Sequence, residues 1–156
     1  MSESTSTQIY LDYAAAHPLS SATKEYLISI LDMYGNPSSH YGLSDASRKI
    51  INDSRKAVSS FINCESEEQI LFTSSGCASN TLAIRGYLYK HPEASIYYSP
   101  IAHKSILKSV PSNAQPLIVS KTGMIYTPDL DYMLRNDSNP DKLIIVDYAN
   151  SEKNCL

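Results

Sequence analysis

The segment Phe72-Thr73-Ser74-Ser75-Gly76-Cys77 has the residue types of an anion-binding turn. An apolar run precedes it and a helical pattern follows it, so small residues would join a strand to a helix. Free backbone N–H groups and the positive end of the helix dipole would then point at one spot, which suits a phosphate. Gly76 would let the backbone come close, and Ser74 or Ser75 would add a hydroxyl. The alternative is an ordinary helix N-cap that binds no ligand.

His103 follows a second apolar run, within Pro100-Ile101-Ala102-His103-Lys104. An imidazole at the end of a strand could stack on a cofactor ring or transfer a proton near neutral pH. The other interpretation is a surface histidine at the start of a helix.

Two further positions have side chains suited to a ligand. Asn150-Ser151-Glu152 follows the apolar run 143–146, and amides and hydroxyls at a strand end can orient a ligand. A plain turn is the alternative. Cys77 would lie at a helix N-terminus, which favours the thiolate and hence reactivity, although a small packing residue fits the position equally well.

Hydrophobic periodicity and turn residues predict the elements that would position these side chains. The expected helices are at about 21–33, 44–62, 77–89, 103–109 and 128–135, and the expected strands are at about 69–73, 95–99, 117–120 and 142–148. Gly35-Asn36-Pro37-Ser38-Ser39 and Thr122-Gly123 are typical of turns.

Strands and helices alternate from about residue 69 onward, which predicts an α/β protein with a mainly parallel sheet. Ligands of such sheets bind beyond the carboxyl ends of the strands. The three polar positions, 74–77, 103 and 150–152, all follow expected strands, so we expect them at that edge of the sheet.

The composition excludes several classes of protein. A formal net charge of −3 gives no basic surface for nucleic acid. No apolar run has the length of a membrane span, and the polar start 1–8 is expected to be a flexible tail rather than a secretion signal. The three cysteines lack metal-type spacing and are an odd number, so we expect no metal site and a reducing, cytoplasmic setting.

Six stretches in order resemble the cysteine desulfurases, a group of class V, fold-type-I enzymes that use pyridoxal phosphate (PLP). They are Ile9 to Ala15, Gly35 to Ser39, Phe72 to Ser74, Leu82 to Gly86, His103-Lys104 and Asn150 to Glu152. The resemblance implies the three-layer α/β fold of the PLP-binding large domain, of which 9–152 would be the N-terminal part. Residues 153–156 diverge from the family pattern.

The resemblance also implies roles for individual residues. Ser75, Gly76 and Cys77 would bind the PLP phosphate, with Cys77 in place of the usual threonine. His103 would stack on the pyridine ring and move protons. Asn150 and Ser151 would lie at the cofactor, Ser151 at the position of an asparagine that contacts the 3′-oxygen.

The family reaction transfers sulfur from L-cysteine to an enzyme cysteine, gives L-alanine and supplies iron–sulfur cluster biogenesis. None of the lysines or cysteines in this sequence matches the lysine that binds PLP covalently or the cysteine that accepts the sulfur. We therefore expect a truncated desulfurase-like protein that is inactive alone and forms a homo-oligomer or associates with a complementary chain. The alternatives are a non-enzymatic binding module, one chain of a split PLP enzyme, and a relative of the class V aminotransferases or selenocysteine lyases.

Overall fold

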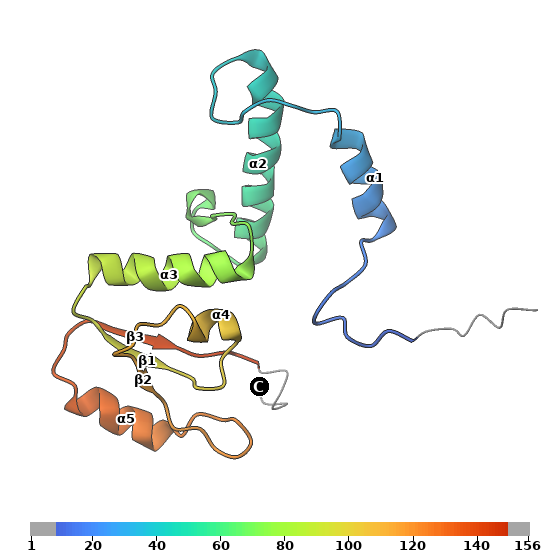
Figure 1. Ribbon diagram of the computed structural model, residues 1–156. Coiled ribbons are helices and arrows are strands. Elements are labelled where there is room, and N and C mark those ends of the chain that lie inside the picture. Colours follow the sequence, from blue (N-terminus) through green and yellow to red (C-terminus); the bar gives the residue numbers. More distant parts are fainter. Residues whose placement is uncertain (1–8, 150–156) are drawn as a thin grey trace, which may run out of the picture. The chain divides into compact units, whose positions relative to one another are not determined.

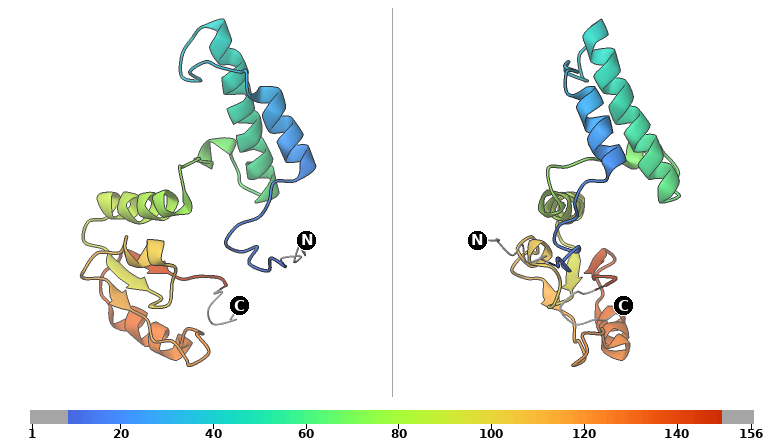
Figure 2. Two further views of the ribbon diagram at one scale, coloured as in Figure 1. Left: turned by 45° about the vertical axis from the view of Figure 1, so that its right-hand side comes forward. Right: turned by 90° about the vertical axis from the view of Figure 1, so that its right-hand side faces the viewer.

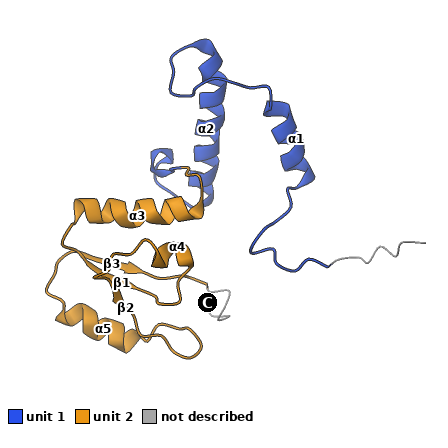
Figure 3. Cartoon of the chain, in the orientation of Figure 1, with its two compact units in different colours: residues 1–71 blue, residues 72–156 orange. Residues whose placement is uncertain are grey.

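The computed structural model describes residues 9–149 of the chain, which divides into two compact units. Unit 1 ends at Leu71 and unit 2 begins at Phe72 (Figure 3). The predictions for 1–8, for Asn150 and Ser151 and for 153–156 lie outside the described residues.

Within its described residues, 9–71, unit 1 has two α-helices and one short 3-10 helix, η1. Helix α1 spans Ser21–Ile30, α2 spans Gly42–Phe61, and η1 spans Glu67–Gln69. Helix α1 begins after Ser20, whose hydroxyl accepts a hydrogen bond of 3.1 Å from the N–H of Thr23, as an N-cap serine does. The two helices expected in this part of the sequence are confirmed, with ends shifted by at most three residues.

The turn between α1 and α2 is held by Arg48. Its guanidinium donates to the carbonyl of Pro37 over 3.1 Å and to that of Ser39 over 2.5 Å. Gly35 opens this turn with φ +144°, a conformation that favours glycine. The expected turn is therefore present, and a side chain from the following helix fixes its backbone.

Unit 2 is built on a three-stranded parallel sheet with the order β2-β1-β3. Strand β1 is Ser95–Tyr98, β2 is Gln115–Pro116 and β3 is Lys142–Ile145. Helices α3 (Gly76–Lys90) and α4 (Lys104–Leu107) cover one face of the sheet, and α5 (Thr127–Asn136) covers the other (Figures 1 and 2). This three-layer, parallel arrangement confirms the predicted α/β fold class.

The buried apolar core of the described chain lies in unit 2. Ile84 of α3 packs with Ala102 and with Ile106 of α4, and Ile145 of β3 packs against this group. Across 9–71, the buried side chains are Ser44 and Ser59 only. The hydrophobic stabilisation that a buried core gives therefore belongs to unit 2.

Two predicted strands were wrong in extent or kind. Residues 70–73 form no strand, and Leu71 and Phe72 are exposed. The apolar run favours a strand, but a strand also needs a pairing partner. The carbonyl of Ile70 instead accepts from the Arg55 guanidinium. The strand expected at 117–120 is found at Gln115–Pro116, and Leu117 extends the pairing by donating its N–H to the carbonyl of Tyr98.

The remaining elements are as predicted, with small shifts at their ends. Strand β3 ends at Ile145 rather than at 148, and helix α4 is shorter than expected. Gly123 forms the expected turn with φ +91°, closed by its N–H to the carbonyl of Ser120. None of the helices within 9–149 combines the length and the apolar character needed to cross a bilayer.

Candidate functional site

The N-terminus of α3 is the first part of the candidate site. Ser75 is its N-cap residue, in extended backbone conformation, and its hydroxyl accepts from the N–H of Ala78 over 3.2 Å. The first bond of the helical ladder runs from the N–H of Ser79 to the carbonyl of Ser75. The N–H groups of Gly76 and Cys77 precede that bond, so they point out of the helix start without an intrahelical acceptor.

Two hydroxyls brace the chain as it enters α3. Thr73 donates to the carbonyl of Ser75 over 2.9 Å, and its Oγ1 lies 2.6 Å from the hydroxyl of Ser79. The backbone that carries the exposed N–H groups is thus fixed by side chains on both sides. This fixed backbone favours anion binding, because the N–H donors are already oriented before a ligand arrives.

Space is open in front of Gly76. A Cβ atom built on this glycine meets no atom within 4 Å, and the glycine has no positive φ. The residue therefore serves close approach to its backbone rather than an unusual conformation. A shallow hollow of 490 Å³ runs along the same helix and is lined by Cys77, Ala78, Thr81, Leu82 and Arg85. The Cys77 thiol is free and exposed.

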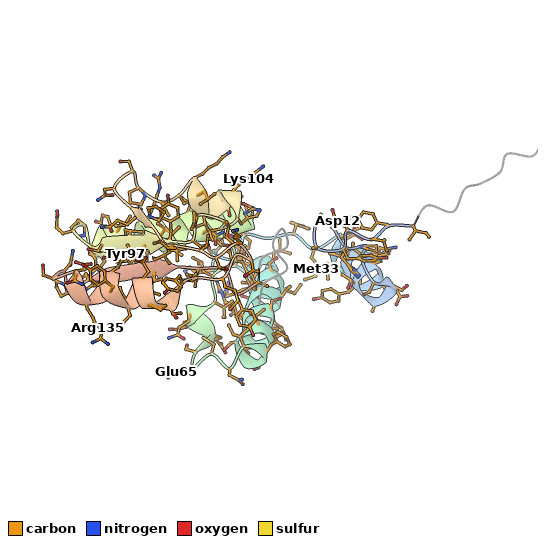
Figure 4. The ribbon with its side chains drawn as sticks, turned by 90° about the horizontal axis from the view of Figure 1, so that it is seen from below. Asp12, Met33, Glu65, Tyr97, Lys104 and Arg135 are labelled. Atoms are coloured by element: carbon orange, nitrogen blue, oxygen red, sulfur yellow. The ribbon has the colours of Figure 1, made fainter. Side chains whose placement is uncertain are left out.

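His103 is the N-cap residue of α4. Its Nδ1 accepts from the N–H of Ser105 over 3.2 Å and lies 2.7 Å from the Ser105 hydroxyl. The residue itself is exposed, whereas Ser105 is buried with 7% of its surface accessible. Lys104, the next residue, lies at the surface of unit 2 (Figure 4).

Two polar bridges join α3 to α4 and to the turn that follows it. The side-chain amide of Asn80 donates to the hydroxyl of Ser105 over 2.8 Å. One turn further along, the hydroxyls of Thr81 and Ser109 lie 2.8 Å apart, and Ser109 also donates to the carbonyl of Ser105. With the apolar contacts of Ile84, these bridges set the position of α4 on α3.

The bridges relate His103 to the start of α3. Asn80 lies four residues after Gly76, which is about one helical turn, or ~6 Å along the axis. Because Ser105 bonds to Asn80, the imidazole that Ser105 contacts lies near the first turn of α3. In Figure 1, the start of α3 and helix α4 lie at the end of the sheet where β1 and β3 terminate. Sequence reasoning expected 74–77 and His103 at that edge.

Sequence patterns do not indicate roles for Asn80, Ser105, Thr81 or Ser109. Each bonded pair is 25 or 28 positions apart, so no local spacing connects its members.

Beyond the end of β3, Oδ2 of Asp147 is buried without a hydrogen-bond partner among the described residues. Throughout 9–149, no group of three or more His, Cys, Asp or Glu side chains could hold a metal ion.

Comparison with known proteins identifies the family to which this chain is similar. The model of the aminotransferase class-V family matches residues 9–121. The cysteine desulfurase IscS of Dictyoglomus turgidum is 32% identical over 158 residues, covering 93% of this chain and 38% of that protein. The enzyme of the same name from Clostridium botulinum is 30% identical over 154 residues, with the same two coverages.

A solved structure agrees with these sequence matches. The NifS-like protein of Rickettsia africae superposes with a TM-score of 0.82 at 27% identity, covering 92% of this chain and 40% of that chain. The chain thus spans about two fifths of the length of the relatives it matches. Because the family model covers more than half of the 156 residues, the chain belongs to the aminotransferase class-V family.

Proposed function

We propose that this chain provides the phosphate-binding and ring-contacting part of a cysteine desulfurase-type PLP site. In this proposal the phosphate binds at Ser75, Gly76 and Cys77, and His103 contacts the pyridine ring. Asn150 and Ser151, which lie outside the described residues, complete the proposed set. In the complete enzyme, the reaction would be the transfer of sulfur from L-cysteine to an enzyme thiol, leaving L-alanine.

One observation carries the proposal: α3 begins at the surface with two backbone donors that its own helix does not use. Helix N-termini of this kind favour phosphate through both their N–H groups and the helix dipole. The open space at Gly76 gives a phosphate access to these donors. The residues described therefore fit the phosphate end of PLP.

The fit to the PLP phosphate is weaker at Cys77. Family members usually have a threonine there, whose hydroxyl is a stronger hydrogen-bond donor than a thiol. None of the lysines in the sequence has the neighbours of the family's PLP-binding lysine. We propose that these 156 residues bind the cofactor reversibly, and that sulfur transfer needs residues that they do not contain.

PLP, where it is bound, supplies an electron sink for bonds broken at an amino acid's α-carbon. This chain's residues would bind and orient it. The N–H groups of Gly76 and Cys77 would donate to phosphate oxygens, and the Ser75 hydroxyl would add one donor while keeping its bond to Ala78. His103 would present its Nε2 to the pyridine ring of the cofactor and would exchange protons there.

A binding measurement with pyridoxamine phosphate tests the phosphate site. This PLP analogue has an amine in place of the aldehyde, so it cannot react with surface lysines. We expect the chain to bind it more tightly than pyridoxamine, which lacks the phosphate, and we expect Ser75→Ala to weaken binding several-fold. Ser20→Ala is the matched control, because Ser20 caps α1 through the same type of bond.

Two results would contradict this part of the proposal. One is equal affinity for the analogues with and without phosphate. The other is an equal loss of affinity in Ser75→Ala and Ser20→Ala, since that would point to general destabilisation rather than to the start of α3.

A second experiment tests the absence of covalent binding. Reduction of the PLP-treated chain with borohydride, followed by peptide mapping, should give scattered, substoichiometric labelling of surface lysines. Stoichiometric labelling of one lysine would overturn reversible binding. Sulfide release from cysteine should be absent for this chain alone, and its appearance on adding a polypeptide with the family's lysine and cysteine would support the split-enzyme version.

A further inference from the structure

We propose that Asn80 and Ser105 are positioning residues that hold His103 as the neutral tautomer with its proton on Nε2. The inference deepens the proposed function, on which its meaning for the cofactor rests. The hydrogen bonds that carry it are internal to unit 2 and need no ligand. They are three in number: Asn80 to Ser105, Ser105 hydroxyl to His103, and Ser105 N–H to His103.

The backbone bond sets the direction of the chain of hydrogen bonds. The N–H of Ser105 can only donate, so Nδ1 of His103, 3.2 Å away, must offer a lone pair. In a neutral imidazole, the proton then resides on Nε2. The hydroxyl of Ser105, 2.7 Å from the same nitrogen, also acts as a donor to it.

Asn80 makes that hydroxyl orientation the favourable one. Its amide NH₂ donates to Ser105 Oγ over 2.8 Å and occupies the acceptor side of the oxygen. The hydroxyl proton of Ser105 is then directed toward His103. Since Ser105 is only 7% accessible, water does not readily compete for these bonds.

The result is a ring held through one nitrogen with the other nitrogen outward. No described residue bonds to Nε2 of His103, and the residue is exposed. A histidine fixed in this way presents one defined donor to a ligand near the start of α3. Without the two positioning residues, the ring would retain only the backbone bond and would exchange more freely between tautomers.

The test uses the full chain labelled with nitrogen-15 and no cofactor. Long-range proton–nitrogen correlation spectra at mildly alkaline pH report which ring nitrogen of His103 bears the proton. We expect the Nε2–H form to dominate in the unmodified chain. Ser105→Ala should raise the share of the Nδ1–H form several-fold, and Ser105→Thr, which keeps the hydroxyl, should restore the original tautomer.

Asn80→Asp provides a sharper variant. A carboxylate only accepts, so it would draw the Ser105 hydroxyl proton away from His103 and shift the tautomers as Ser105→Ala does. Thr81→Ala is the matched control: it removes the neighbouring bridge to Ser109 but keeps the side chains of Asn80, Ser105 and His103.

Three outcomes would overturn the inference. They are a dominant Nδ1–H form in the unmodified chain, no tautomer change in Ser105→Ala and Asn80→Asp, and an equal change in Thr81→Ala. Circular dichroism of each variant checks that it is folded. Failure of pyridoxamine phosphate to bind would contradict the proposed function but leave the tautomer result standing, so the two proposals are tested separately.

Discussion

The hydroxyl of Tyr97, in the central strand β1, donates a hydrogen bond of 2.8 Å to Oδ2 of Asp137 at the end of α5. Tyr97 is 2% accessible, so this bond joins the interior of the sheet to the helix on its second face. The other carboxylate oxygen of Asp137 accepts from the N–H of Asn139 over 2.9 Å. The carboxylate therefore links strand β1 to the end of α5 and to the residues that follow this helix.

This pair predicts how the stability of unit 2 depends on pH. Hydrogen bonds from the N–H of Asn139, and then from the side chains of Ser95 and Tyr97, lower the pKa of Asp137 from its ordinary 3.8. Burial, and then the bond to Asp137, raise the pKa of Tyr97 from its ordinary 10.0. The contribution of Asp137 to the stability of unit 2 is thus complete above its ordinary pKa. It is lost as the pH falls through the lowered pKa of the folded state.

The contribution of Tyr97 to stability depends on pH in the opposite direction. Its contribution is complete below pH 10.0 and is lost as the pH rises through its raised pKa. Urea unfolding midpoints measured across pH should therefore fall at both ends. Asp137→Asn should flatten the acidic limb, and Tyr97→Phe the alkaline one. An acidic limb of unchanged slope in Asp137→Asn would contradict the assignment.

The contact of Ile84 with α4 predicts a large loss of stability on truncation. Ile84 is 4% accessible and packs with Ala102 and Ile106. Ile84→Ala should lower the free energy of unfolding of unit 2 by about 2–5 kcal/mol, the usual cost of emptying a packed core position. Leu82→Ala is the control on the same helix, because Leu82 is 49% accessible.

Chemical denaturation followed by circular dichroism measures both variants. Leu82→Ala should lose less than half as much stability as Ile84→Ala. Equal losses would mean that the packing of Ile84 on α4 does not dominate the stability of unit 2.

The outcome of sequence reasoning differs between local and long-range features. The start of α3 was predictable because an apolar run, small residues and a helical pattern adjoin within about ten residues. The strand expected at 69–73 was not found, because pairing depends on a partner elsewhere in the chain. The link from Asn80 through Ser105 to His103 was missed for the same reason, since it appears only once α4 packs on α3.

Gly35 should tolerate no side chain. A Cβ atom at this residue would lie 2.4 Å from the carbonyl oxygen of Leu43, and its φ of +144° is strained for any L side chain. Gly35→Ala should therefore cost about 1–3 kcal/mol, as overpacked positions do. Hydrogen exchange of the amides in the turn and the start of α2 should accelerate in this variant.

Gly42→Ala is the matched control for that measurement. Gly42 is the first residue of α2, and a Cβ atom built there meets nothing within 4 Å. The exchange rates should stay unchanged or fall slightly, because alanine favours a helix. If both substitutions accelerate exchange equally, the close approach of Gly35 to Leu43 is not what limits the turn.

Cys77→Thr should strengthen phosphate binding at the start of α3. Threonine would add a hydroxyl donor beside the N–H groups of Gly76 and Cys77, and one net hydrogen bond is worth about 0.5–1.5 kcal/mol. The affinity for pyridoxamine phosphate should therefore rise about two- to tenfold. Cys77→Val is the matched control, since valine has the shape of threonine without the hydroxyl. If the threonine and valine variants bind equally, position 77 contributes no side-chain hydrogen bond, and the phosphate is held by the backbone and Ser75 alone.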